Sequence, residues 1–129
     1  MAGVFRSLDF VYVPTVDVDA AVEEYAALGA TLRWKVRGMG TTVAAVEVTD
    51  GGPLVLLSGH LEGQVPILVY RVDDYGSATS RLRTGGIELT ELEIPHGPCA
   101  SFRLGQQRYA VYELARPGAA TQFEGRIDP

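Results

Sequence analysis

Hydrophobic and polar residues follow each other along this chain in a pattern that occurs twice. Residues 4–13 are rich in apolar and β-branched side chains, which predicts a strand. Apolar residues then recur at helical spacing over residues 18–28. Either Asp17 or Asp19 can cap this helix, and Gly29 stands where a left-handed residue often ends one. The pattern predicts a strand followed by a capped amphipathic helix.

Three more apolar segments follow this helix, separated by turns rich in glycine. They are residues 30–36, 41–48 and 54–58. The first alternates between apolar and polar residues, as a half-buried strand does, and the last is almost continuously apolar. The first half of the chain is therefore predicted to have the order β-α-β-β-β.

The second half repeats this order. Residues 67–72 are predicted to form a strand, and Asp74 to begin a helix that ends at Gly85-Gly86. Three strands are then predicted at residues 87–94, 99–104 and 108–114, with an interruption at Pro95-His96-Gly97-Pro98.

The two halves align at one constant offset of 57 residues. The pairs are Phe10 and Ile67, Asp17 and Asp74, Ala21 and Ala78, Tyr25 and Leu82, and Gly29 and Gly86. One offset for strand, helix cap, helix face and terminal glycine indicates internal duplication. We expect one domain, residues 1–129, with a first module at about 4–60, a linker at about 60–66, a second module at about 67–116 and a tail at 117–129.

The duplicated unit resembles the vicinal oxygen chelate superfamily, which includes glyoxalase I, bleomycin-resistance proteins and extradiol dioxygenases. The matching motifs are Phe10-Val11-Tyr12-Val13 leading to Asp17, Leu28-Gly29, Val72-Asp73-Asp74, and Glu93-Ile94-Pro95-His96-Gly97-Pro98 before the last two strands. The resemblance implies an α+β fold. Two tandem βαβββ modules would form a curved mixed sheet with a concave ligand hollow, and the helices would lie on the outer face.

The resemblance also implies where a metal would bind. Metal-dependent members take His, Gln or Glu ligands from the first and last strands of each module, and these positions correspond here to Phe10, Ile67 and the neighbourhood of Ala110. None of these side chains can bind a divalent ion. Residues 54–58, the last strand of the first module, contain no carboxylate. We therefore expect no metal at the family's usual site and no cofactor.

Three residues are candidates for acid–base or nucleophilic chemistry. Glu47 lies in an apolar strand: it points into the hollow if Ala44 and Val46 pack on the helix, and the alternative is a carboxylate in water or paired with Arg33. Both histidines lie in predicted loops. His96 is the better candidate of the two, because its loop lies at the predicted mouth of the hollow, whereas His60 lies in the linker. Cys99 has no base at fixed spacing and is expected to be a small buried strand residue.

Apolar and aromatic side chains are predicted to line the hollow, together with Glu47. They are Phe10, Tyr12, Trp34, Ile67, Phe102, Ala110 and Tyr112. Apolar walls with a few polar tips suit flat organic ligands. The first hypothesis is therefore a metal-free protein that binds a small hydrophobic or aromatic molecule. The second is an enzyme that uses Glu47, His96 or a relocated metal, and the third is a structural or interaction domain.

Charge and composition limit the partners. The net charge is −5, with 16 acidic and 11 basic residues and no basic cluster, so nucleic acid is not an expected partner. The charge favours a cationic ligand through weak long-range attraction. No apolar segment is long enough to span a bilayer and no secretion signal is visible, so we expect a cytoplasmic protein without a membrane partner. Superfamily members commonly pair, so we expect a homodimer, with residues 122–126 of the tail across the partner.

Overall fold

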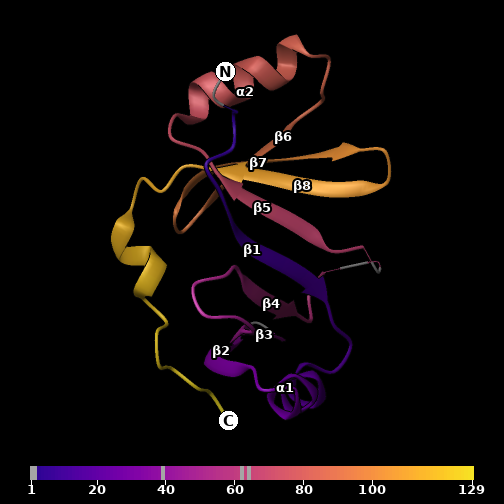
Figure 1. Ribbon diagram of the computed structural model, residues 1–129, viewed down its shortest axis with the longest axis vertical. Helices are drawn as coiled ribbons and strands as arrows, with labels where there is room; N and C mark the ends of the chain where they lie inside the picture. The colour runs from indigo at the N-terminus through magenta and orange to yellow at the C-terminus, as the bar shows by residue number, and fades with distance from the viewer. Residues whose placement is uncertain (1–2, 39, 62, 64) are drawn as a thin grey trace. The chain divides into compact units, whose positions relative to one another are not determined.

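The computed structural model describes residues 3–38, 40–61, 63 and 65–129 (Figure 1). Its elements are β1 (Ser7–Pro14), α1 (Val18–Ala27), β2 (Thr31–Gly38), β3 (Thr41–Glu47), β4 (Leu54–Ser58), β5 (Ile67–Arg71), α2 (Tyr75–Thr84), β6 (Thr90–Ile94), β7 (Gly97–Leu104), β8 (Gln107–Tyr112) and the 3₁₀ helix η1 (Pro117–Thr121). This order confirms the predicted α+β fold of two βαβββ modules. In the described part of the chain, no helix is both long and apolar enough to cross a membrane.

The described chain forms two compact units that correspond to the two modules. The first module comprises residues 10–66 together with residues 123–129 of the tail. The second comprises residues 67–122 together with the residues up to Asp9, so the start of β1 belongs to it. The tail predicted at residues 117–129 is thus divided between the two units.

In the first module, α1 covers one face of a four-stranded sheet. The strands lie in the order β2-β3-β4-β1, in which β1 and β4 are parallel and the other neighbours antiparallel. Val18 of α1 is buried against Ala44 and Val46 of β3 and Leu57 of β4. Because alternate residues of a strand face opposite sides, this contact fixes which residues face away from the helix.

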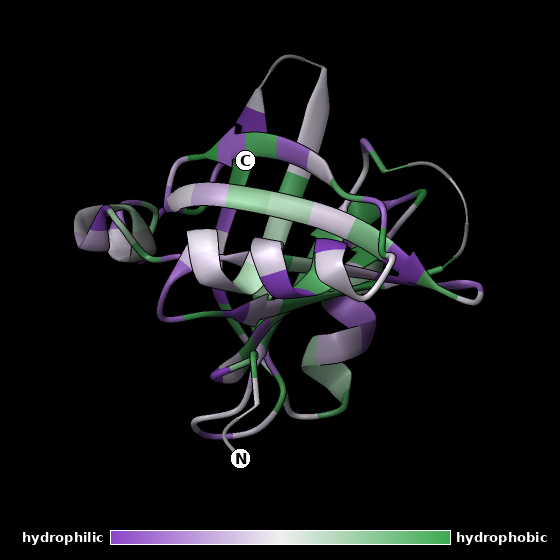
Figure 2. Cartoon of the chain, turned by 90° about the horizontal axis from the view of Figure 1, so that it is seen from above, coloured by the Kyte–Doolittle hydropathy of each residue, from purple (hydrophilic) through white to green (hydrophobic). Residues whose placement is uncertain are grey.

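The second module repeats this arrangement with α2. Its strands lie in the order β5-β8-β7-β6, with β5 and β8 parallel and the others antiparallel. The core between α2 and the sheet contains Ala78, Leu82, Ala100, Phe102 and Val111. Figure 2 shows hydrophobic residues concentrated along strands, whereas the helix nearest the viewer is mostly polar on its outer side.

Both helices begin and end as their sequences predict. The side chain of Asp17 accepts a hydrogen bond from the backbone N–H of Ala20 at 3.0 Å, and Asp74 caps α2 in the same way through Ser77 at 2.9 Å. Of the two predicted caps for α1, Asp17 is the correct one. Gly29, with φ of 95°, follows α1 in the left-handed conformation that glycine adopts without strain.

The second module differs from prediction at the start of β7. The segment Pro95-His96-Gly97-Pro98 is not an interruption between strands: β7 begins at Gly97, which pairs with Ile94 of β6. Residues 95–96 form the tight turn of this hairpin. Gly97 allows the strand to begin here for two reasons. It adopts a φ of 152°, and it lies so close to the backbone carbonyl of Glu113 that a side chain would collide.

The end of the tail extends the sheet of the first module. The N–H of Lys35 in β2 donates to the carbonyl of Arg126 at 2.8 Å, and the N–H of Asp128 donates to the carbonyl of Lys35 at 2.9 Å. Lys35 and Ile127 form a parallel bridge. The tail, expected on a partner, therefore covers the outer edge of this chain's own β2.

Candidate functional site

The face of each sheet that is turned away from its helix is called its inner face. One row of paired residues crosses the inner face of the first module. Tyr12 of β1 pairs with Leu56 of β4, Leu56 pairs with Ala45 of β3, and Ala45 pairs with Trp34 of β2. Leu56 and Ala45 are buried, whereas the two aromatic residues at the ends are only partly buried. Two of the predicted ligand-binding residues thus stand on either side of an apolar floor.

A β-bulge places Trp34 on this face. The register of β2 against β3 shifts between Leu32 and Trp34, so that Arg33 is an extra residue. Leu32 packs in the core under α1, and regular alternation would put Trp34 on that same side. The extra residue shifts the alternation by one position, so the indole of Trp34 faces the inner side of the sheet. Bulges commonly change the direction of a side chain in this way.

Phe10 and Glu47 belong to the neighbouring row, in which Leu54 stands between them. Ala44 and Val46 pack on α1, and Glu47 alternates with Val46 along β3. Glu47 therefore faces inward, as the sequence predicts for this packing. Its carboxylate forms an ion pair with Arg33 at 3.0 Å. Arg33 also binds Glu124 of the tail, with 2.8 Å between Nε and Oε1. Pairing with Arg33, the alternative to an acid–base role, is therefore what the structure shows for Glu47.

The tail brings a further aromatic ring to this face. The ring of Phe123 lies 5.4 Å from that of Trp34, tilted by 54°. The guanidinium of Arg126 lies 5.8 Å from the centre of the Phe123 ring, within cation–π distance. Together with the ion pair between Arg33 and Glu124, these contacts fasten residues 123–126 beside Trp34.

The predicted residues of the second module separate onto two faces. Ala110 and Tyr112 of β8 pair with Val69 and Arg71 of β5 on the inner face, and Ile67 begins this β5 series. Ile67, Ala110 and Tyr112 are all buried. Phe102, predicted to line the hollow, lies instead in the core under α2, where its ring stacks on Tyr109 at 5.6 Å. The sequence interpretation put Phe102 on the wrong face because Cys99-Ala100-Ser101-Phe102 offers two alternating sets, and the more apolar set faces the helix.

A polar cluster around Asp9 lies on the inner face of the second module. The carboxylate of Asp9 accepts hydrogen bonds from the hydroxyl of Ser7 at 2.6 Å and from the hydroxyl of Tyr112. The Nε atom of Arg71 lies 3.4 Å from the same carboxylate. Sequence reasoning missed Asp9 and Arg71. An acidic residue within an apolar first strand was the one signal that could have identified Asp9.

His96 lies beside this cluster. Its ring meets that of Tyr112 edge to face, with the centres 5.7 Å apart. Burial lowers the pKa of His96, while Asp9 acts to raise it and Arg116 to lower it. The imidazole is therefore held in its neutral form at pH 7, the form that can accept a proton.

The remaining candidates are His60 and Cys99. His60 is exposed in the turn after β4, as its loop position predicts. Cys99 is buried within β7, and burial raises the pKa of its thiol to about 11. A thiol that stays protonated is a poor nucleophile, so Cys99 has the structural role that the sequence indicates.

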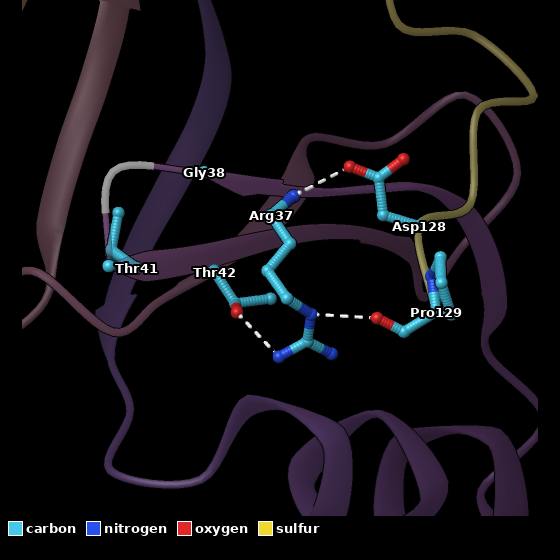
Figure 3. A pocket seen from close by; sticks show the side chains of 7 residues that line it. Arg37, Gly38, Thr41, Thr42, Asp128 and Pro129 are labelled. Atoms are coloured by element: carbon cyan, nitrogen blue, oxygen red, sulfur yellow. Dashed lines mark hydrogen bonds between the residues drawn. The ribbon is translucent and has the colours of Figure 1, made fainter.

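A surface hollow of about 580 Å³ lies elsewhere in the first module, between the β2–β3 turn and the tail (Figure 3). Its cation, Arg37, donates to the carbonyl of Pro129 at 2.7 Å and to the hydroxyl of Thr42 at 3.1 Å. The third nitrogen of Arg37 binds Asp19 at 3.0 Å. Each of the three nitrogens has a protein acceptor, so this arginine holds the end of the tail against β2 and β3.

Solved structures with similar chain traces identify the fold. Methylmalonyl-CoA epimerase from Mycobacterium tuberculosis superposes with a TM-score of 0.73 at 22% identity, covering 93% of this chain and 95% of that one. A glyoxalase/bleomycin resistance protein/dioxygenase superfamily member from Vibrio splendidus gives 0.59 at 13% identity, covering 81% and 95%. The chain has the vicinal oxygen chelate fold. The predicted resemblance to this superfamily is thus confirmed at the level of the fold.

Other comparisons set the limits of this similarity. A variant of glyoxalase I from Zea mays gives a TM-score of 0.61 at 13% identity, and the match covers 85% of this chain but only 45% of that one. No protein-family model and no curated protein matches the sequence. At these identities the similarity establishes the fold, and the chemistry of the site has to be judged from its own residues.

The side chains at the positions that correspond to the ligands of metal-dependent superfamily members do not fit a metal ion. Phe10, Ile67 and Ala110 offer no oxygen or nitrogen donor in their side chains. Among the described residues, no three side chains of His, Cys, Asp or Glu come close enough together to hold an ion.

Proposed function

We propose that this protein binds a small aromatic or hydrophobic molecule, without a metal, on the inner face of the first module. The observation that supports the proposal most strongly is the row from Tyr12 to Trp34, with aromatic residues at its ends and Leu56 and Ala45 as its floor. Aromatic walls around an apolar floor suit a flat organic ring, which stacks or meets them edge to face.

The polar residues at the margin of this face would orient the ligand. Glu47 and Glu124 both form ion pairs with Arg33, so the three side chains together carry one net negative charge. A neutral or cationic ligand fits beside such a group. The net charge of −5 adds weak long-range attraction for a cationic one.

The chain's single tryptophan makes the proposal directly testable. Trp34 lies at the proposed site, so its fluorescence reports contact with a ligand. We would titrate the protein with neutral, cationic and anionic naphthalene derivatives and follow both Trp34 emission and the melting midpoint. Binding should change the emission saturably and raise the midpoint, because a ligand that binds only the folded chain stabilises it.

Two matched variants locate the binding. Tyr12→Ala should weaken binding at least about tenfold, or about 1.4 kcal/mol. Phe5→Ala removes a ring from the second module, where Phe5 stacks on Tyr70, and should leave binding unchanged. If no probe shifts the midpoint, or if Tyr12→Ala binds as well as the wild type, the proposal is wrong and an interaction role becomes the better hypothesis.

A second candidate function is a metal-free enzyme that uses His96 as a general base. The observation that favours it is the contact of His96 with Tyr112, whose hydroxyl donates to Asp9. A neutral imidazole beside a hydrogen-bonded phenol is suited to proton transfer. Solvent deuterium incorporated next to the carbonyl of small oxo acids, and abolished by His96→Ala but not by His60→Ala, would support this role. Metal analysis of protein purified without chelator would test whether either function is metal-free.

A further inference from the structure

We propose that Arg71, in the polar cluster of the second module, is a binding site for a single carboxylate group of a small molecule. The proposed site belongs to the second module, whereas the aromatic site belongs to the first, and the proposal does not rest on that function. It depends on the position of Arg71 relative to Asp9 and on the nitrogen atoms of Arg71 that form no hydrogen bond with the described residues.

Arg71 is a partly buried arginine with no hydrogen bond among the described residues. Its Nε atom is inaccessible to solvent and has no hydrogen-bond acceptor. Its distance to Asp9 Oδ2, 3.4 Å, is that of an ion pair rather than of a well-formed hydrogen bond. The side chain as a whole is 34% exposed, so the guanidinium can be reached from outside. The two terminal nitrogens are not buried, so they are the part of the guanidinium that a ligand can reach.

Asp9 lies on the Nε side of Arg71, and both of its oxygens accept hydrogen bonds from other residues. Oδ1 accepts from Ser7 at 2.6 Å and Oδ2 accepts from Tyr112. These two bonds hold the carboxylate in a position from which it approaches only the Nε side of Arg71. The fork of terminal nitrogens on Arg71 therefore has no partner in the described part of the chain.

Arginines with a purely structural role look different in this protein. Arg116 donates from Nε to the carbonyl of Pro95 at 2.8 Å, and from NH2 to Glu93 at 2.8 Å and to the carbonyl of Ile94 at 2.7 Å. Arg37 likewise uses all three nitrogens. The side chain of Arg71 is less exposed, at 34%, than those of Arg37 and Arg116, at 43% and 54%, yet it forms none of these hydrogen bonds. This difference points to an acceptor that comes from outside the chain.

Charge and shape select a carboxylate as that acceptor. The guanidinium is planar and rigid, and its fork of N–H groups matches the two oxygens of a carboxylate. Asp9 already provides one negative charge at 3.4 Å from Arg71. A second single charge can be accommodated on the far side of the guanidinium, whereas a doubly charged phosphate would meet stronger repulsion from Asp9.

The test uses acetate and benzoate as probes, with inorganic phosphate for comparison. In the 129-residue chain, the NMR signal of the Arg71 Nε–H group should shift saturably with acetate and benzoate at pH 7. Arg71→Gln should weaken benzoate binding at least tenfold, as judged by the shifts of neighbouring backbone amides. Arg103→Gln, which changes an exposed arginine of β7, should leave it unchanged. Circular dichroism would establish that each variant is folded.

Each outcome decides for or against the carboxylate site. Unchanged benzoate binding in Arg71→Gln, an equal loss in Arg103→Gln, or no saturable shift in the wild type would overturn it. Phosphate binding tighter than benzoate would overturn the assigned ligand class. If Arg71→Gln does not fold, Arg71→Lys keeps the charge but removes the fork: a severalfold loss of benzoate affinity supports the site, and full retention overturns it.

Discussion

Tyr12 and Trp34 lie at opposite ends of one row of residues that crosses the sheet of the first module. The paired residues Leu56 and Ala45 stand between them. Neighbouring strands lie about 4.8 Å apart, so the ends of this row are separated by roughly 14 Å across the sheet. Ala45 and Leu56 are almost completely buried, so the floor between the two aromatic residues is apolar. The row is the structural basis of the proposed binding function.

Replacing Phe123 tests how the tail contributes to this site. Phe123→Ala removes the ring that lies 5.4 Å from Trp34, and should expose the indole and shift its emission to longer wavelength. The lost aromatic contact should lower the free energy of unfolding by about 0.5–1.5 kcal/mol, in addition to the loss from reduced burial. Phe5→Ala removes a ring stacked on Tyr70 at 4.8 Å and serves as the control. Unchanged emission in Phe123→Ala would show that the tail does not cover Trp34 in solution.

The helix caps give a prediction that rests equally on sequence and structure. Asp17→Ala and Asp74→Ala each remove the acceptor of a backbone N–H in the first turn of a helix. Each should lower the free energy of unfolding by about 0.5–2 kcal/mol in urea denaturation. Asp50→Ala, in an exposed turn, should change stability by less than about 0.5 kcal/mol. Equal effects at all three positions would contradict the capping role.

The sequence was sufficient to predict the order of elements because each boundary has a local cause. Asp17 and Asp74 cap helices, and Gly29 and Gly86 end them in the left-handed conformation. These signals act within a few residues and repeat at one offset, so they determine the two modules. The contacts of the tail with β2 join residues far apart in the chain and could not be predicted in this way.

The candidate site was predictable only in part, because strand faces depend on register. Phe10 and Tyr12 follow simple alternation along β1. Trp34 reaches the inner face only through the bulge at Arg33, for which the sequence gives no local signal. Phe102 was misplaced because its strand allows two alternating sets, and only the contact with α2 decides between them. The partnership of Asp9 with Tyr112 joins residues 103 positions apart.

Gly97 is a position where glycine is required for two reasons. Its φ of 152° is unfavourable for other residues, and a Cβ atom there would lie 2.3 Å from the backbone carbonyl of Glu113. Gly97→Ala should therefore lower the free energy of unfolding by about 3 kcal/mol or more. Gly105→Ala also places alanine at a positive φ, 62°, but meets no atom within 4 Å, and should cost only about 1–2 kcal/mol. Similar losses in urea denaturation would show that the close approach to Glu113 is unimportant.

The buried position of His96 predicts a specific pH dependence of stability. Burial lowers the pKa of His96 in the folded chain, so below about pH 6.5 the unfolded chain binds this proton more readily. Stability should therefore fall as the pH drops below that value, until the folded histidine also becomes protonated. Urea denaturation between about pH 5 and 7.5 should show a smaller fall for His96→Gln than for the wild type. His60→Gln, in an exposed turn, should behave like the wild type.

The predicted homodimer can be examined through the edge of β6. In the described part of the second module, β6 is the last strand of its sheet, and Leu92 on it is 46% exposed. An unpaired edge with an exposed apolar residue favours association with another chain. Glu91 and Glu93 on the same strand would repel their copies in a second chain. Their ion pairs with Arg83 and Arg116 reduce this repulsion. If the edge mediates dimerisation, sedimentation velocity at micromolar concentration should show a dimer that Leu92→Lys dissociates. Leu104→Lys, at a residue 48% exposed beside the β7–β8 turn, should leave the dimer intact. A wild-type monomer would contradict the prediction, and a dimer that survives Leu92→Lys would place the interface away from this edge.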